Sequence, residues 1–155
     1  MSDVYRWQAG EHLMVAGPTG VVLLDPQIGV QLAEEIFEEL QRGTTLGAVL
    51  QLLTHAYDLW TIPPFVIALR NAGDLQVVVR GPMHVRVASA GGDDRMSGKG
   101  VSTWTERLFE RVRSFSVSWN EHVDGPTLPV TGAVLWAGSI SWGPSRYPDQ
   151  PAGAG

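Results

Sequence analysis

The first residues of the chain place two short apolar runs on either side of a glycine and proline turn. The runs are residues 12–16 and 21–25, and Gly17-Pro18-Thr19-Gly20 separates them. Glycine and proline supply the dihedral angles that a chain reversal needs, so the pattern predicts a β-hairpin. Pro26 follows the second run and cannot donate to a strand ladder, so we expect the strand to end there.

Two helical patterns follow the hairpin. Apolar residues recur at the i, i+3, i+4 and i+7 spacing that places side chains on one face of a helix. In the first pattern they are Ala33, Ile36, Phe37 and Leu40, and in the second they are Leu46, Val49, Leu50 and Leu53. Gly43 suits the end of the first helix, and Thr44 or Thr45 suits the N-cap of the second. Pro63-Pro64 prevents the second helix from continuing.

From residue 65 the spacing changes to the alternation typical of strands. Residues 65–70, 75–80 and 83–89 predict a meander of three strands, with turns at residues 71–74 and at Gly81-Pro82. Residues 90–100 are polar and rich in glycine, so we predict a loop there. Apolar and serine residues then alternate over residues 114–119, which predicts a half-buried strand. Upstream the apolar positions have the opposite parity, so we expect a bulge or break near residues 108–111.

The last part of the ordered sequence predicts a closing hairpin. Its strands are residues 130–136 and 139–142, with a turn at Ala137-Gly138. Residues 144–155 are rich in proline, glycine and alanine, which is typical of a disordered linker or tail. Two consecutive helices near the N-terminal third and about eight short strands indicate an α+β fold built on a mainly antiparallel sheet or sandwich. We predict one domain over residues 1–143.

Composition narrows the classes of function. The chain has no cysteine, which excludes disulfides and thiolate chemistry and favours a reducing compartment, so we predict a cytoplasmic protein. No apolar run approaches the roughly 20 residues of a membrane-spanning helix. The net charge is −5, and the basic residues at 107, 111 and 113 alternate with acidic ones, so nucleic acid is not an expected partner.

No catalytic, cofactor or metal motif is present. The four histidines, at positions 12, 55, 84 and 122, lack the spacing of metal ligands. Asp93-Asp94 could bind a divalent cation, but an oxygen cage requires more ligands at fixed spacing than the sequence supplies nearby. Gly98-Lys99-Gly100 lacks the hydroxyl residue and the following helix of a phosphate-binding loop. We therefore predict no catalytic residue and no cofactor.

The six tryptophans are the remaining candidates. Most of them are expected in the core, because tryptophan buries a large apolar surface. Trp60, just before the double proline, and Trp142, near the predicted linker, are in segments that resemble loops. An exposed aromatic side chain in such a place is a typical anchor for a protein partner, so Trp60 and Trp142 are the candidate partner-binding residues.

Three stretches carry a family resemblance. They are Glu11-His12-Leu13-Met14-Val15-Ala16-Gly17, Pro63-Pro64-Phe65-Val66-Ile67-Ala68 with residues 75–81, and Gly100-Val101-Ser102-Thr103-Trp104-Thr105-Glu106. Together they resemble the N-terminal region that precedes a forkhead-associated (FHA) domain in multidomain proteins of high-GC Gram-positive bacteria. The resemblance covers residues 5–142 and implies a non-enzymatic role in phosphorylation-dependent signalling or assembly. It carries no functional residues, and the FHA domain itself is absent from this sequence.

A second resemblance is to the metal-dependent protein phosphatases. Asp25 and Thr44-Thr45 stand where such an enzyme has its metal-binding Asp-Gly and its Gly-Thr-Thr. Pro26 follows Asp25 in place of glycine, and Gly81-Pro82-Met83-His84 replaces a further acidic motif. The resemblance therefore implies an inactive relative, because two-metal chemistry needs those carboxylates.

The leading hypothesis is a protein-interaction or scaffold module that lies N-terminal to a phosphothreonine-reading domain. The alternatives are a phosphatase-like domain with a divalent cation at Asp25, Asp93 and Asp94, and a small-molecule sensor. The sequence specifies neither the partner nor the oligomeric state.

Overall fold

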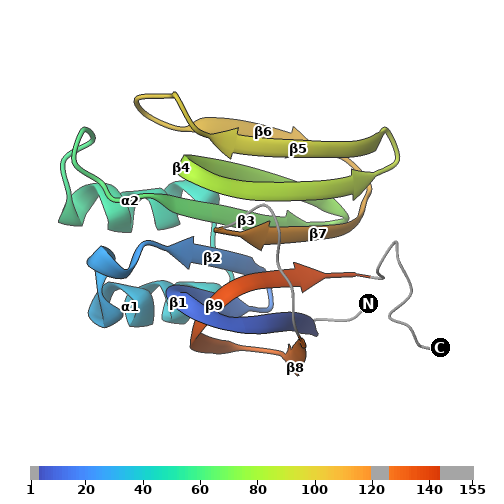
Figure 1. Cartoon of the computed structure of the whole chain (residues 1–155), viewed down its shortest axis with the longest axis horizontal. Coiled ribbons are helices and arrows are strands. Elements are labelled where there is room, and N and C mark those ends of the chain that lie inside the picture. The colour runs from blue at the N-terminus through green and yellow to red at the C-terminus, as the bar shows by residue number, and fades with distance from the viewer. Residues whose placement is uncertain (1–3, 120–125, 144–155) are drawn as a thin grey trace.

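The computed structural model describes residues 4–119 and 126–143. Its fold is α+β with a mostly antiparallel sheet and two consecutive helices, as predicted (Figure 1). The elements, in chain order, are β1 (Tyr5–Gly17), β2 (Gly20–Leu24), the 3-10 helix η1 (Pro26–Ile28), α1 (Val30–Arg42), α2 (Leu46–Ala56), β3 (Phe65–Asn71), β4 (Asp74–Ser89), β5 (Gly92–Gly98), β6 (Thr105–Phe109), β7 (Val112–Ser118), β8 (Leu128–Val130) and β9 (Ala133–Trp142).

The strand pairings form a closed ring. The order β2-β3-β4-β7-β9-β1 returns to β2, because β1 also pairs with β2, and every pairing is antiparallel. Outside this ring, β5 and β6 pair with β4, and β8 pairs with β1. The closure is partial, because β9 pairs with β7 only over residues 139–142. In the described sheet, residues 133–137 of β9 have β1 as a partner on one side only.

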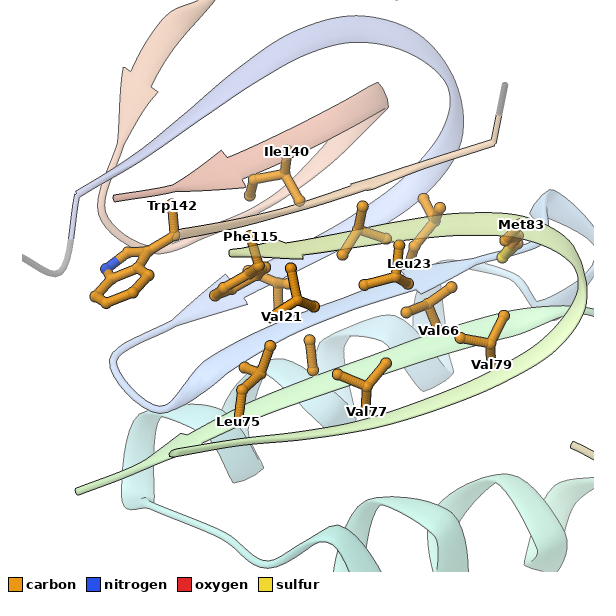
Figure 2. Packing of buried hydrophobic residues seen from close by; sticks show 14 of the residues in the cluster. Val21, Leu23, Val66, Leu75, Val77, Val79, Met83, Phe115, Ile140 and Trp142 are labelled. Atoms are coloured by element: carbon orange, nitrogen blue, oxygen red, sulfur yellow. The ribbon is translucent and has the colours of Figure 1, made fainter. Parts of the chain in front are cut away.

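The long strand β4 bends at Gly81 and takes different neighbours on either side of the bend. Its first part pairs with β3 and β6, and its second part pairs with β5 and β7. Figure 2 shows the bend beside Met83. We predicted a turn at Gly81-Pro82 that would separate two strands, and this is wrong. The strand continues through a register irregularity between Gly81 and His84. Pro82 lies in this irregularity and is tolerated there, because the residues of a bulge need not donate a backbone N–H to the neighbouring strand.

A second irregularity lies in the pairing of β1 with β9, near Gly10 and Gly138. Their register shifts between Gln8 and His12, and a Cβ atom on Gly10 would lie 2.3 Å from the backbone nitrogen of Gly138. The predicted hairpin turn at Ala137-Gly138 is therefore wrong, because Gly138 is the extra residue of a bulge within the continuous strand β9. β1 is also longer than predicted, and the Tyr5 hydroxyl donates a 2.7 Å hydrogen bond to the carbonyl of Gly17 at its other end.

Residues 92–98 form β5, where we predicted a loop. The strand pairs with β4 over its whole length, and Met96 alone among its side chains is a large apolar group packed in the core. Backbone hydrogen bonds to β4 hold this polar edge strand, so its residues need no apolar alternation that would predict a strand. The predicted break near residue 110 is confirmed, because β6 ends at Phe109 and Arg111 takes a positive φ of 51° before β7.

Successive side chains along the strands point to opposite sides of the sheet and so pack into two different cores. Residues that point into the ring form one core, which Figure 2 shows; they include Met14, Val21, Leu23, Val66, Val77, Val85, Phe115 and Ile140. Residues of the other parity on β1, β2 and β3 pack against the two helices and include Leu13, Val22, Phe65, Ile67, Ile36, Leu40 and Leu53. The two helices thus cover one part of the outer surface of the ring. Neither helix has the length and apolar character to span a lipid bilayer.

Candidate interaction site

Trp60 lies on the connection between α2 and β3, and its side chain is 68% exposed. The preceding residue, Leu59, is 38% exposed. The connection is a compact turn, because the amides of Thr61 and Ile62 both donate to the carbonyl of Asp58. Ile62 is buried in the core beneath the helices and fixes the turn to the ring. The structure therefore presents Trp60 on an ordered turn, in the exposed position that the sequence predicts.

Arg80 holds this turn against a second connection. Its Nε donates a 2.6 Å hydrogen bond to the carbonyl of Ile62, and its Nη1 donates to the carbonyls of Ser102 and Thr103 at 3.0 and 2.8 Å. The β5–β6 connection therefore lies beside the α2–β3 connection, and both are at the upper left of Figure 1. Next to these contacts, Trp104 packs on Phe65 with 6.2 Å between ring centroids.

The second connection adds another exposed apolar side chain. Val101, beside the Ser102 carbonyl that Arg80 binds, is 44% exposed. Leu59, Trp60 and Val101 are three of the large apolar side chains that the described residues leave exposed, and we call these three the Trp60 platform. Leu59, Val101 and the role of Arg80 could not be predicted from local patterns, because the two connections are 40 residues apart in the chain and are brought together by the sheet.

Trp142 is not an exposed anchor, so this part of the prediction is wrong. It is the last residue of β9, its side chain is only 9% exposed, and its ring stacks on Phe115 at 5.7 Å. The guanidinium of Arg70 lies 4.6 Å from the centre of the same ring and 5.6 Å from that of Tyr5. The parity set by the bulge at Gly138 directs Trp142 into the core, as Figure 2 shows.

Trp142 and Arg70 line a cavity of about 250 Å³ at this end of the ring. The other lining residues are Pro18, Thr19, Ala72, Gly73, Asp74 and Val112. Pockets for drug-sized ligands usually have volumes of about 300–1,000 Å³. This cavity is smaller, and it therefore gives a small-molecule sensor little support.

The three aspartates of the alternative metal site do not converge. Asp25 follows β2, is buried, and accepts a 2.9 Å hydrogen bond from the amide of Gln27. Its own amide donates to the carbonyl of Pro64, near the bend of β4. Asp93 and Asp94 pair with Ala88 and Val87, six or seven residues beyond that bend, or about 20 Å along a strand. Instead, the Oδ1 atom of Asp94 lies 3.7 Å from Nη1 of Arg107, with which it forms an ion pair.

The histidines are dispersed. His12 stacks on Trp119 with 4.1 Å between ring centroids, and burial lowers its pKa although the charges of Asp25 and Glu11 oppose this. His84 is in β4, His55 is in α2, and His122 lies outside the described residues. Within residues 4–119 and 126–143, no three His, Asp or Glu side chains are grouped so that they could hold a metal ion.

A groove of about 440 Å³ lies between α1 and α2. Its lining residues are Leu32, Glu35, Glu39, Ala48, Gln51, Leu52, His55 and Ala56. Glu39 accepts hydrogen bonds from the Thr44 hydroxyl and from Arg42, and these bonds lower its pKa. The carboxylate of Glu39 is therefore engaged at the junction between the two helices.

No protein-family model, curated protein or solved structure matches this chain.

Proposed function

We propose that the chain is a non-enzymatic protein-interaction module and that the Trp60 platform is its contact surface. The observation that carries the proposal is a tryptophan that is 68% exposed on a turn fixed by hydrogen bonds. Tryptophan is the residue type most enriched among the side chains that dominate binding energy at interfaces. An anchor held in place before binding loses little conformational entropy when the complex forms, so more of its burial contributes to affinity.

The exposure itself favours a partner. Transfer of an indole ring out of water lowers the free energy, yet the fold buries Ile62 of this connection and leaves Trp60 and Leu59 exposed. The complementary surface would be an apolar pocket with a polar rim, as at other protein interfaces. We further propose that this partner is met in the cytoplasm, since a chain without cysteine suits a reducing compartment. The position N-terminal to an FHA domain stays a prediction from the resemblance alone.

The test compares two exposed tryptophans. The full chain, a Trp60→Ala variant and a Trp136→Ala variant serve as baits in a lysate of the organism that encodes the chain. Trp136 is 51% exposed on β9, so its variant controls for the general stickiness of a surface indole. We expect one or a few proteins that the wild-type chain and the Trp136→Ala variant retain and the Trp60→Ala variant loses.

Each candidate partner is then purified and titrated against the three chains. A loss of about tenfold or more in affinity for Trp60→Ala alone is the result we expect, because such anchors contribute 2 kcal/mol or more. Partners that bind all three chains equally, or a chain that retains no partner, would contradict the proposal.

A further inference from the structure

A polar face lies on the outer surface of β5, β7, the second part of β4 and the ends of β1 and β9 that carry Arg6 and Ser141. The outward residues of β1 that pack on the helices, such as Leu13, lie outside this face. These strands follow one another in the sheet, and Figure 1 shows them from top to bottom. Two rows of side chains cross the face in direct register. One row is Arg95, Arg86, Ser116, Ser141 and Arg6, and the other is Ser97, His84, Ser118, Ser139 and Gln8. We call these ten positions the serine face.

Alternation along each strand assigns these side chains to the outside. Their neighbours, among them Val85, Phe115, Val117 and Ile140, point into the core of the ring. The arginines at positions 6, 86 and 95 are exposed, whereas the serines between them are half-buried. The centre of the face is therefore a shallow floor of hydroxyl groups, and longer cationic side chains stand at both sides of it.

The charge of the face is opposite to that of the chain. Three of the 11 Lys and Arg residues and none of the 16 Asp and Glu residues occupy its ten positions, although the chain carries a net charge of −5. The nearest acid of β5 on this side is Asp93, which lies one row further along, opposite Ala88. A local excess of cationic side chains on an acidic protein favours the approach of anionic groups to this face.

Two arginines of the face are direct cross-strand partners. Arg86 of β4 pairs with Arg95 of β5. Two cationic side chains therefore stand next to each other at this side of the face. At the other side of the face, Arg6 donates from Nε to the Thr127 hydroxyl and from Nη2 to the Thr127 carbonyl, both at 2.9 Å. These two hydrogen bonds orient a guanidinium group before any ligand binds.

We propose that the serine face binds an acidic, extended segment of a partner protein. Three strand spacings separate Arg86 from Arg6, which is about 14 Å, and an extended chain of about five residues spans that distance. Carboxylates at the two ends of such a segment would meet the arginines, and its backbone would lie over the serine hydroxyls, which both donate and accept hydrogen bonds.

The same observations disfavour a nucleic acid on this face. Single strands bind to grooves whose aromatic side chains stack on the bases, and the ten positions hold no Phe, Tyr or Trp. A long polyanion would also extend beyond three arginines onto an acidic protein surface, whereas a short acidic segment ends within the face.

The test uses fluorescence anisotropy with a labelled hexaglutamate peptide and the full chain. At low ionic strength we expect saturable binding that weakens as salt shortens the range of the attraction. The double variant Arg86→Gln/Arg95→Gln should weaken binding about fivefold, because each exposed ionic contact contributes modestly. Arg42→Gln on α1 removes a charge from outside the face and should change the affinity less than twofold. Circular dichroism confirms that all variants are folded.

Several results would overturn the proposal. They are the absence of peptide binding, equal binding by the double variant and the wild type, and tighter arginine-dependent binding of a dT hexanucleotide than of hexaglutamate. A dimer in sedimentation velocity that the double variant loses would identify a second copy of the chain as the occupant instead. Trp60→Ala should leave peptide binding unchanged, so this proposal and the function proposed for the Trp60 platform can fail separately.

Discussion

The contact between Gly10 and Gly138 allows a sharp test of the bend shared by β1 and β9. A Cβ atom on Gly10 would lie 2.3 Å from the nitrogen of Gly138, 2.5 Å from its Cα and 2.7 Å from the carbonyl carbon of Ala137. All three are backbone atoms, so no side-chain rotation can relieve the overlap. A Cβ atom on Gly138 would lie 3.5 Å from the Ala9 carbonyl oxygen, which is an ordinary contact. Neither glycine has a positive φ, so alanine is compatible with both backbones.

The two alanine variants should therefore differ in stability. Gly10→Ala must separate two paired strands by about 1 Å, and overpacking of this kind costs typically 1–3 kcal/mol. We expect about 3 kcal/mol, at the upper end, because the overlap is with backbone. Gly138→Ala should change the stability by less than about 1 kcal/mol in either direction, since it also restricts the unfolded chain.

Urea unfolding followed by tryptophan fluorescence measures this difference. With an m-value near 2 kcal/mol/M, the midpoint for Gly10→Ala should fall by about 1.5 M. The melting temperature should fall by about 6–12 °C in a chain of this size. Equal midpoints for the two variants, or a larger loss for Gly138→Ala, would refute the close approach of β1 and β9 at this bend.

Three further predictions concern single side chains. Trp142→Ala should cost about 3–5 kcal/mol because it empties a packed site, whereas Trp60→Ala should stay within about 0.5 kcal/mol of the wild type, and equal urea midpoints would contradict the burial of Trp142. Thr45→Ala should cost about 1 kcal/mol in the same assay, because the Thr45 hydroxyl accepts a 3.2 Å hydrogen bond from the amide of Ala48 at the start of α2; Thr45→Ser should retain the cap. Burial lowers the pKa of His12 below its ordinary 6.5, so the unfolded chain binds this proton more readily and stability should fall as the pH drops through about 6.5. His12→Gln should remove that part of the dependence of the urea midpoint on pH, and an unchanged profile would contradict the assignment.

Local patterns made much of the fold predictable. The apolar faces of both helices could be predicted from residues three and four apart, and the structure buries them against β1, β2 and β3. The turn at residues 71–74 could be predicted from its residues, which include Gly73, between two alternating runs. In the structure Ala72 and Gly73 take positive φ values of 52° and 90° in this turn. The same kind of signal placed Thr44 or Thr45 at the start of α2, and the structure selects Thr45.

Features set by distant parts of the chain could not be predicted in this way. Glycine followed by proline is typical of a turn, and only the change of partners from β3 and β6 to β5 and β7 makes it a bend in a continuous strand. The direction of Trp142 depends on one extra residue at Gly138, which exists because β1 bulges opposite it. The sequence predicted exposure because Trp142 stands in a segment near the predicted linker that resembles a loop. A one-residue change in register moves a side chain to the other face of a strand, and local context does not reveal that change.

The candidate sites were predictable to different degrees for the same reason. Trp60 stands in a local context, between a helix and a double proline, and its exposure follows from that context. The alternation of serines in β7 identified a polar strand face, but the arginines that flank it come from β1, β4 and β5. A surface composed of five strands becomes visible only when their register is known.

The bend at Gly81 explains how one strand supports both surfaces. Arg80 and Arg86 of β4 both point out of the ring, because β4 keeps its alternation through the bend. Before the bend, the outer surface adjoins α2 and its connection, so Arg80 is used in hydrogen bonds that hold the Trp60 platform. After the bend, the outer surface is the serine face, and Arg86 is exposed to solvent. A side chain at residue 81 would meet Pro64 at 2.7 Å, and φ is 90° there, so only glycine permits this change of surroundings. The two surfaces therefore depend on one backbone position while they share no side chain, which is why we expect substitutions in one to leave binding at the other intact.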